Sequence, residues 1–243
     1  GNQAFGGDSS EVSSELSGEI DVIKIVGNEY SFAALREDGS VVNWGFNRYF
    51  DNSAINSELS GELKVIDIFQ NRFAYAALRE DGSVFTWGRQ AWGGNSSEFA
   101  SELSGEIDVI EINSDSFYGF AALREDGSVV SWGNLEQPNN ISNLSGEIDV
   151  IELIAHEVPN FLAIREDGSV VTWGHNDIDI TDVASELSGE IDVIEIINSD
   201  RMGSWAALRE DGSVVTWGND WGGDSSAVAD ELSGEIDVIK IIS

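Results

Sequence analysis

The sequence of 243 residues lacks cysteine and holds only two prolines and twelve basic residues. Without cysteine there are no disulfides, no thiol catalysis and no thiolate metal sites. An apolar run of about 18 residues, which a membrane-spanning helix needs, is also absent, so we expect no membrane insertion. The 45 acidic residues give a formal net charge of -33. Because phosphate binding depends on basic side chains, we expect no nucleic-acid partner.

What the sequence does contain is an internal repeat. Asp-Gly pairs recur, and Leu-Ser-Gly-Glu occurs six times. The Asp-Gly pairs begin at Asp38, Asp81, Asp126, Asp167 and Asp211. We divide a single repeat domain, 1–243, into five complete repeats and an incomplete sixth. The repeats are 1–44, 45–87, 88–132, 133–173, 174–217 and the incomplete 218–243. The sequence opens inside a repeat, so we expect a mature protein or a segment of a longer array.

Each repeat carries a predicted β-hairpin, written "AALREDGSVVTW" in the fifth copy. Asp-Gly between strand-forming residues indicates a two-residue type I′ turn. In the first copy this turn at Asp38-Gly39 would pair Leu35 with Val42 and Ala33 with Trp44. Both faces of the hairpin are then substantially apolar, which favours a stack or ring of sheets over a half-solvated sheet.

Two further elements are predicted in every repeat. A strand precedes the hairpin, at 19–25 and 62–68 in the first two copies, and its nearly continuous apolar residues indicate burial on both sides. Before that strand, segments such as "GGDSSAVADELSG" predict one or two turns of helix. In this copy Ser226 would be the cap and Gly234 the stop.

The repeat resembles the regulator of chromosome condensation family. The motif "ALREDGSVVTWG" is followed in the last copy by Gly223-Asp224-Ser225-Ser226 and then by Leu232-Ser233-Gly234. The pattern is most similar to the bacterial branch typified by the propeller-type β-lactamase inhibitor protein, and it covers essentially the whole chain. The resemblance implies an all-β fold, a β-propeller of three- to four-stranded blades with five complete repeats and a half repeat. An open β-solenoid stack is the alternative.

Residues for catalysis or metal binding are scarce. His156 and His175 have no repeated partner, and no nucleophile elbow, phosphate loop or zinc spacing occurs. We therefore expect no enzyme activity and no cofactor. The acidic segments 175–182 and 219–226 offer oxygens to calcium but lack the spacing of a calcium loop, so polar loops are favoured.

Two sets of variable loops are the candidates for function, one after each Trp-Gly and one before each hairpin. Aromatic residues within them are candidate binding anchors. These candidates are Tyr49, Phe50, Trp92, Phe117, Tyr118, Trp205 and Trp221. Trp92 and Trp221, which both precede Gly-Gly, are better explained as packing residues at a blade edge but are kept as candidates.

The pattern indicates a non-enzymatic repeat scaffold, a structural or protein-binding module of a bacterial protein that is secreted or displayed on the cell surface. Its partner would be a protein or a second copy, the latter through the half repeat that is duplicated at 1–25 and 218–241. A glycan-binding, lectin-like propeller and a protein inhibitor are the alternatives.

A first prediction concerns cations. Carboxylates recur along the strands before the hairpins, as in Asp108 with Glu111 and Asp192 with Glu195. Because they repel one another, adding millimolar calcium or magnesium should raise the melting temperature modestly. Thermal unfolding at constant ionic strength checks this, and an unchanged melting temperature would contradict it.

Overall fold

The computed structural model describes residues 7–45, 58–135, 144–155, 160–174, 180–199, 203–218, 223–235 and 237–242. The chain forms two compact units, Gly1–Leu135 and Glu136–Ser243, called here the N-terminal unit and the C-terminal unit. The strands form five three-stranded antiparallel sheets, and the middle strand in sequence is also the middle strand of each sheet. In the described part of the chain, no helix is long and apolar enough to cross a membrane.

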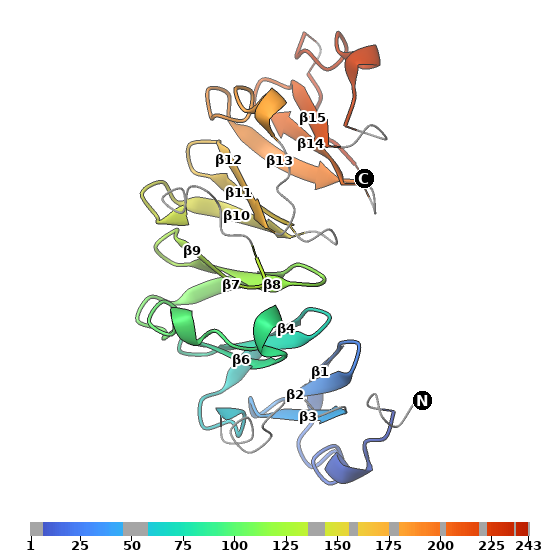
Figure 1. Cartoon of the computed structure of the whole chain (residues 1–243), viewed down its shortest axis with the longest axis vertical. Helices are drawn as coiled ribbons and strands as arrows, with labels where there is room; N and C mark the ends of the chain where they lie inside the picture. Colours follow the sequence, from blue (N-terminus) through green and yellow to red (C-terminus); the bar gives the residue numbers. More distant parts are fainter. Residues whose placement is uncertain are drawn as a thin grey trace. The chain divides into compact units, whose positions relative to one another are not determined.

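Three sheets lie as successive layers in the N-terminal unit (Figure 1). Their strands are β1 (Val22–Gly27), β2 (Ser31–Arg36), β3 (Val41–Gly45), β4 (Val65–Gln70), β5 (Ala74–Arg79), β6 (Val84–Gly88), β7 (Val109–Ser114), β8 (Gly119–Arg124) and β9 (Val129–Gly133). The C-terminal unit contains the other two sheets. Their strands are β10 (Val150–Ala155), β11 (Asn160–Arg165), β12 (Val170–Gly174), β13 (Val193–Asn198), β14 (Ser204–Arg209) and β15 (Val214–Gly218).

The hairpin turn differs from the predicted two-residue loop. In the second sheet Gly82 N–H donates to Arg79 O (3.1 Å) and Arg79 N–H donates to Ser83 O (2.9 Å), which makes a three-residue loop. Gly82 is left-handed, with φ 71°, as the last residue of such loops is. The Asp81 carboxylate accepts the Ser83 hydroxyl (2.6 Å) and N–H (3.1 Å). Both bonds lower the pKa of Asp81, and they explain why Ser follows each Asp-Gly.

The longer loop changes the pairing of the hairpin strands. Leu35 lies opposite Val41, and Trp44 lies opposite Phe32, so the predicted pairing of Ala33 with Trp44 is wrong. The tryptophan of each sheet instead stacks on an aromatic side chain of the middle strand, at centroid distances of 5.0 to 6.3 Å. These pairs are Phe32–Trp44, Tyr75–Trp87, Phe120–Trp132, Phe161–Trp173 and Trp205–Trp217.

Successive sheets within a unit pack face to face, as the two apolar faces predict. Ala74 and Ala76, both fully buried on one face of the second sheet, belong to the same cluster as Phe120 and Trp132 of the third sheet. Small side chains on one face thus make room for the aromatic pair of the next. Tyr75 adds a polar link, because its hydroxyl donates to Ser31 O (2.8 Å). Burial raises the pKa of Tyr75 to about 12, so its hydroxyl stays neutral.

Backbone hydrogen bonds attach the hairpin turns at Gly39, Gly82, Gly168 and Gly212 to the following repeat. Gly82 O accepts Val109 N–H (3.0 Å), and Val84 N–H donates to Leu103 O (3.0 Å). The first strand of each sheet begins at the valine equivalent to Val109, three residues later than predicted. The residues before this valine lie beside the hairpin turn of the preceding repeat. The incomplete repeat is used in the same way, since Gly212 O accepts Val238 N–H (3.0 Å).

Short 3-10 turns form where helical turns are predicted. They are η2 (Ser10–Val12), η4 (Ser97–Phe99), η6 (Thr181–Val183) and η7 (Ser226–Val228). The predicted cap at Ser226 is wrong, because the Asp224 carboxylate accepts Ser226 N–H (2.9 Å). In the second repeat the arginine of "ALRED" is held by the glutamate that precedes Leu-Ser-Gly. Arg79 is buried and binds the Glu58 carboxylate at 2.7 Å.

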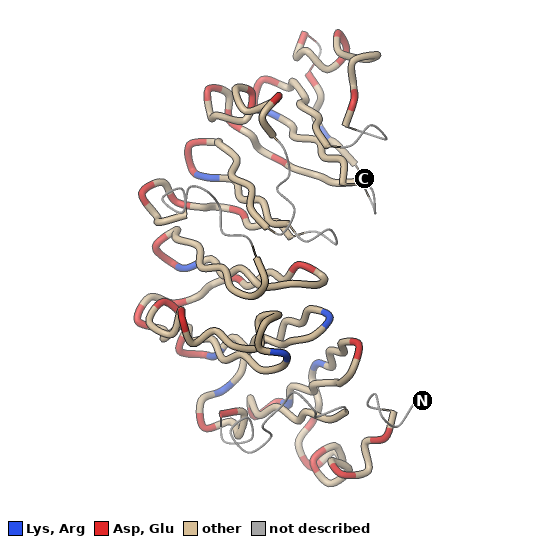
Figure 2. Tube along the Cα trace, viewed as in Figure 1, with Lys and Arg blue, Asp and Glu red and all other residues tan. Residues whose placement is uncertain are grey.

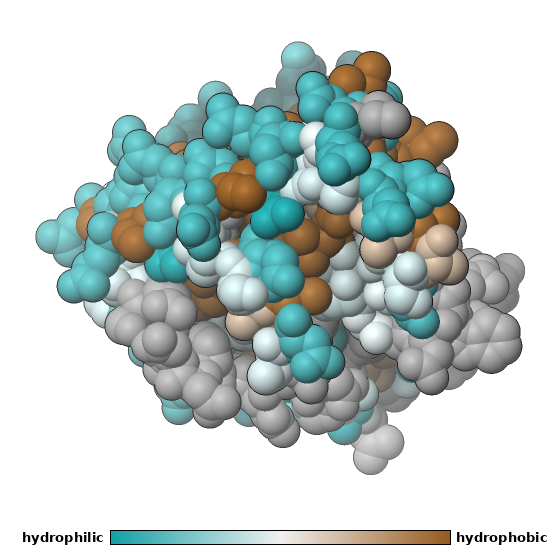
Figure 3. Space-filling model, turned by 90° about the horizontal axis from the view of Figure 1, so that it is seen from above, coloured by the Kyte–Doolittle hydropathy of each residue, from teal (hydrophilic) through white to brown (hydrophobic). Residues whose placement is uncertain are grey.

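Surface polarity follows the acidic composition. On the face drawn in Figure 3, hydrophobic residues form small areas between hydrophilic ones. Along the first strands of the C-terminal unit, Glu152 belongs to the exposed residues. Partial loss of hydration and the nearby negative charge of Glu195 nevertheless raise the pKa of Glu152. The second cause agrees with the repulsion between carboxylates inferred from the sequence.

The tight packing of the hairpin turn yields a second prediction. A Cβ at Gly82 would lie 2.6 Å from Asp108 Cα, whereas a Cβ at Gly18, which has φ 88°, would meet nothing within 4 Å. Gly82→Ala should destabilise the protein by about 3 kcal/mol or more, and Gly18→Ala by about 1 kcal/mol, since only the first adds overpacking to the left-handed penalty. Urea denaturation followed by tryptophan fluorescence measures both. An equal loss of stability in the two variants would contradict this prediction, because it would show that the contact of Gly82 with the next repeat is unimportant.

Candidate functional site

The two ends of the sheets in the N-terminal unit differ in chemistry. Hairpin turns with their Asp and Glu residues lie at one end (Figure 2). Loops between the first and second strands lie at the other, which we call the loop end. The loop end consists of residues 28–30, 71–73 and 115–118. These loops contain five arginine or aromatic residues and two acidic ones. The loop end therefore differs from the strongly acidic rest of the chain and is the candidate site.

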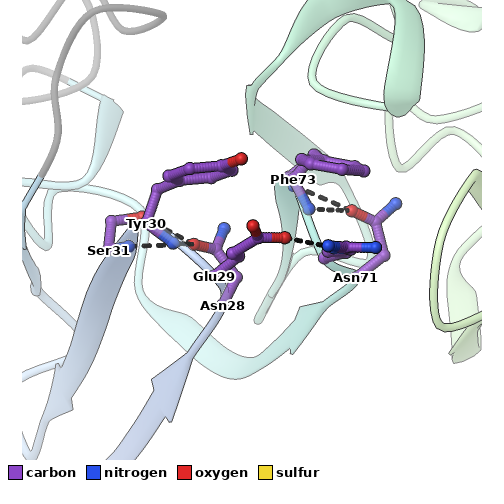
Figure 4. A network of polar contacts seen from close by, with 8 residues as sticks. Asn28, Glu29, Tyr30, Ser31, Asn71 and Phe73 are labelled. Carbon is purple, nitrogen blue, oxygen red and sulfur yellow. Dashed lines mark hydrogen bonds and ion pairs between the residues drawn. The ribbon is translucent and has the colours of Figure 1, made fainter. Parts of the chain in front are cut away.

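An amide or carboxylate at the start of each loop fixes its shape. Asn28 Oδ1 accepts the N–H groups of Tyr30 and Ser31, both at 2.9 Å, as Figure 4 shows. Asn71 does the same for Phe73 (2.9 Å) and Ala74 (2.8 Å). In the third loop the buried Asp115 carboxylate accepts the N–H groups of residues 117–119. These bonds hold the following aromatic side chain in one place.

The three loops are joined to one another. Glu29 N–H donates to Arg72 O (3.3 Å), and Arg72 N–H donates to Ser116 O (3.0 Å). The Glu29 carboxylate also forms an ion pair with the Arg72 guanidinium across the first and second loops (Figure 4). This contact lowers the pKa of Glu29.

Aromatic rings from the loops contact one another in a continuous row. Tyr30 stacks on Phe73 (centroids 6.0 Å apart), Phe73 contacts Trp92 (4.7 Å) and Trp92 stacks on Tyr118 (4.8 Å). Phe117 lies beside Tyr118 at 6.0 Å. All five side chains are only partly buried, so the row is a surface feature rather than a core.

Two arginines complete this aromatic–arginine cluster. Arg72 lies 5.3 Å from the ring centroid of Phe73 and 5.4 Å from that of Phe117. Arg89 lies over Phe73 (5.5 Å) and Trp92 (5.2 Å). Such cation–π contacts keep the guanidinium groups close to the rings, and a guanidinium in this position can still donate hydrogen bonds. The cluster is Tyr30, Arg72, Phe73, Arg89, Trp92, Phe117 and Tyr118.

The backbone around Trp92 is fixed from two sides. Trp92 ends the 3-10 turn η3 (Gln90–Trp92). Its carbonyl O accepts the Asn71 side-chain amide (2.8 Å), and Gly93 O accepts the Trp132 indole N–H (3.1 Å). Because these bonds involve backbone atoms of residues 92 and 93, the ring position does not depend on the neighbouring rings alone.

A shallow hollow adjoins the cluster. Its volume is about 550 Å³, and Arg72 and Phe117 belong to both the hollow and the cluster. The rest of its lining is mainly polar, with side-chain amides of Asn28, Gln70 and Asn71. The arrangement can therefore accept apolar groups on the rings, and anionic or hydrogen-bonding groups at the arginines and amides.

The predicted anchors have different outcomes. Trp92, Phe117 and Tyr118 come together in the cluster, whereas Tyr49, Phe50 and Trp221 lie outside the described residues. Trp205 is not a loop residue, because it lies in strand β14, is 3% exposed and stacks on Trp217. Trp205 occupies the same position in its sheet as Phe32 does in the first sheet. The prediction of a binding anchor at Trp205 is therefore wrong, and the residue belongs to the core.

Sequence reasoning missed Tyr30, Arg72, Phe73 and Arg89. Two signals were available. Asn-x-Tyr and Asn-x-Phe recur at 28–30 and 71–73. Two of the twelve basic residues also lie close to aromatics, Arg72 directly before Phe73 and Arg89 three residues before Trp92. Within the described residues no group of three or more His, Asp or Glu is placed to hold a metal. His156 and His175 lie outside those residues.

Comparison with known proteins informs the fold. No family model and no curated protein matches the chain. Among solved structures, the ectodomain of the receptor kinase CR4 from the moss Physcomitrella patens aligns with a TM-score of 0.50 and 16% identity, over 84% of this chain and 53% of that one. At this identity the likeness shows the fold alone. With the five repeated sheets, it confirms the all-β propeller class.

Two further structures are similar at lower scores. Prp20p from Saccharomyces cerevisiae, described with its binding to Gsp1p and histones, has a TM-score of 0.49 and 18% identity, over 84% of this chain and 58% of that one. Human WBSCR16 has a TM-score of 0.47 and 17% identity, over 84% and 63%. The chain thus spans little more than half the length of the structures that it matches.

The ion pair of the loop end yields a third prediction. The pKa of the Glu29 carboxyl, followed by carbon-13 NMR, should lie below the ordinary glutamate value and return to it in Arg72→Ala, because Arg72 supplies the main hydrogen bond. Arg89→Ala is the matched control, since Arg89 also stacks on Phe73. A Glu29 pKa that stays low in Arg72→Ala would contradict the described contact.

Proposed function

We propose that this chain is a non-enzymatic, protein-binding repeat module and that the aromatic–arginine cluster is its binding surface. The observation that carries the proposal is the row of five partly exposed aromatic rings with two stacked arginines. Trp, Tyr and Arg are the side chains that dominate binding energy at protein interfaces.

The rigidity of the cluster supports the same conclusion. Rings held by backbone bonds and by one another lose little side-chain freedom when a partner covers them. Arg72 pairs with Glu29 through Nε, so its two NH2 groups can still donate to a carboxylate or a carbonyl oxygen of a partner. We therefore expect a protein partner with apolar and acidic groups close together.

Location and source belong to the same proposal. A secreted or surface-displayed bacterial protein fits the high content of acidic residues and the lack of cysteine, and the resemblance of the repeat to a bacterial inhibitor branch. Self-association through the half repeat stays a prediction.

Glycan binding is the second candidate. The hollow of about 550 Å³ favours it, because side-chain amides line the hollow and Phe117 offers a ring beside them. Sugars are bound by such a combination of hydrogen-bonding groups and an aromatic face. The glycan-binding and protein-binding hypotheses therefore predict different ligands for the same loop end.

A fourth prediction tests the proposal with a double variant, Trp92→Ala with Tyr118→Ala. The backbone bonds around residue 92 remain, so we expect a folded protein that has lost its partners, by about 30-fold or more in affinity. Phe99→Ala is the control, because Phe99 is also partly buried but packs on the core. Partners captured by wild type from secreted and surface proteins are identified by mass spectrometry and then titrated individually.

The outcomes separate the candidates. Loss of titrated protein partners in the double variant but not in Phe99→Ala supports the proposal. Equal affinity in all three proteins rules out the cluster as the binding surface. Binding to a glycan array that Gln70→Ala abolishes, without any protein partner, favours the second candidate, because Gln70 lines the hollow outside the cluster.

A further inference from the structure

Each first strand exposes an isoleucine at the same position, and β1 exposes a second one, Ile25 (59%). In the N-terminal unit Ile23, Ile66 and Ile110 are 62%, 55% and 57% exposed. Ile151 and Ile194 occupy the same position in the C-terminal unit and are exposed to a similar extent. Ile66 lies in the middle sheet of its unit and is as exposed as the others. A position at the end of the unit therefore does not explain the exposure of these isoleucines.

A β-bulge produces this exposure. In the second sheet Val65 lies opposite Arg79 and Asp67 lies opposite Leu78, so Ile66 has no residue opposite it. The same interruption occurs at Ile23 and Ile110. A bulge turns the extra side chain away from the regular faces of a sheet. β1, β4 and β7 are also edge strands, so the isoleucines are not covered by another strand of their own sheets.

The three isoleucines form a stripe across the N-terminal unit. β1 contacts β4, and β4 contacts β7 (Figure 1), which places equivalent residues of the three strands side by side. We call Ile23, Ile66 and Ile110 the isoleucine stripe. Leu63, three residues before Ile66, is 43% exposed and widens the apolar surface. Contiguous exposed apolar residues of this kind mark interaction sites more often than isolated ones do.

Charges around the stripe select the partner. The strand segments 19–25, 62–68 and 106–112 carry seven acidic residues and two lysines. Lys24 already forms an ion pair with Asp67. Glu62, Glu106 and Asp108 belong to the exposed residues. A partner with apolar and basic side chains therefore complements this surface, whereas a second copy of this acidic chain does not.

Backbone pairing selects the conformation of the partner. A segment that crosses the first strands cannot form ladder hydrogen bonds with all three, so an extended segment would leave its own N–H and C=O groups unpaired. A helix satisfies these groups internally and returns nearly to the same face about every seven residues. A strand added along one edge would also meet only one isoleucine.

We propose that the isoleucine stripe binds a basic amphipathic helix that runs across the first strands of the N-terminal unit, with one apolar heptad position on each sheet. This site lies on the strand edges and contains no residue of the aromatic–arginine cluster. It does not depend on the function proposed for that cluster.

The test uses the full chain and a defined probe. The probe is a fluorescein-labelled peptide of three Leu-Lys-Ala-Leu-Lys-Ala-Lys heptads, titrated by anisotropy at physiological salt. A peptide of the same composition with scattered leucines controls for charge alone, and an alternating Leu-Lys peptide represents a strand. The protein variant is Ile66→Thr with Ile110→Thr, which keeps β-branched residues in the strands. Val228→Thr, at a residue 46% exposed outside the stripe, is the matched control.

We expect the heptad peptide to bind wild type and Val228→Thr equally, and the double variant about tenfold more weakly or worse, because two apolar contacts are lost. Unchanged thermal unfolding of the variants verifies that they are folded. The proposal is overturned if the heptad peptide does not bind, or if the double variant binds it as well as wild type. It is equally overturned if the scattered or the alternating peptide binds wild type as tightly.

Discussion

The other features depend on one hydrogen bond between neighbouring repeats. In it, the carbonyl O of the hairpin glycine accepts the N–H of the valine that begins the first strand of the next repeat. This bond is 3.0 Å long at Gly39, Gly82 and Gly168. Because a Cβ on Gly82 would lie 2.6 Å from Asp108 Cα, only glycine lets two repeats come this close. The contact fixes how far one sheet is shifted along the next. It thereby decides which side chains meet between sheets, and it explains why Asp-Gly-Ser is invariant in the five copies.

A fixed shift at one end of the sheets has consequences at the other. With equivalent strands in register, the loops of successive repeats lie close enough for Arg72 N–H to reach Ser116 O. The aromatic residue after each Asn or Asp then falls next to that of the neighbouring repeat. Variation in sequence is tolerated there because the asparagine side chain, rather than the variable residue, shapes the loop. The same repeat thus combines a constant, acidic turn with an adaptable, aromatic loop end.

The sequence was sufficient for the existence of the repeats, the position of the hairpins and the burial of both sheet faces, because these follow from local turn chemistry and periodicity. It was not sufficient for strand register. Two- and three-residue loops both suit Asp-Gly, and the choice depends on the Ser83 hydroxyl and on contact with the following repeat. Trp205 was misplaced for a related reason. The connection before β14 in the fifth repeat is longer than the loops at 28–30 and 71–73, so distance from the preceding strand did not show that Trp205 lies in β14.

The surface features were predictable to different degrees. Trp92, Phe117 and Tyr118 are visible as aromatics in variable loops, but their contact with Phe73 joins residues from different repeats and requires the three-dimensional arrangement. The exposure of the isoleucines could not be predicted, because here the sequence pattern itself was misleading. In Val-Ile-Asp-Ile at 65–68 the continuous apolar pattern indicates a buried strand, and a bulge, which has no signature in that pattern, turns Ile66 outward. A propeller-class repeat can therefore carry one surface in the loops that vary and another in the strands that do not. Only the second is repeated in every complete copy, so binding there would be multiplied by the number of repeats that a partner spans.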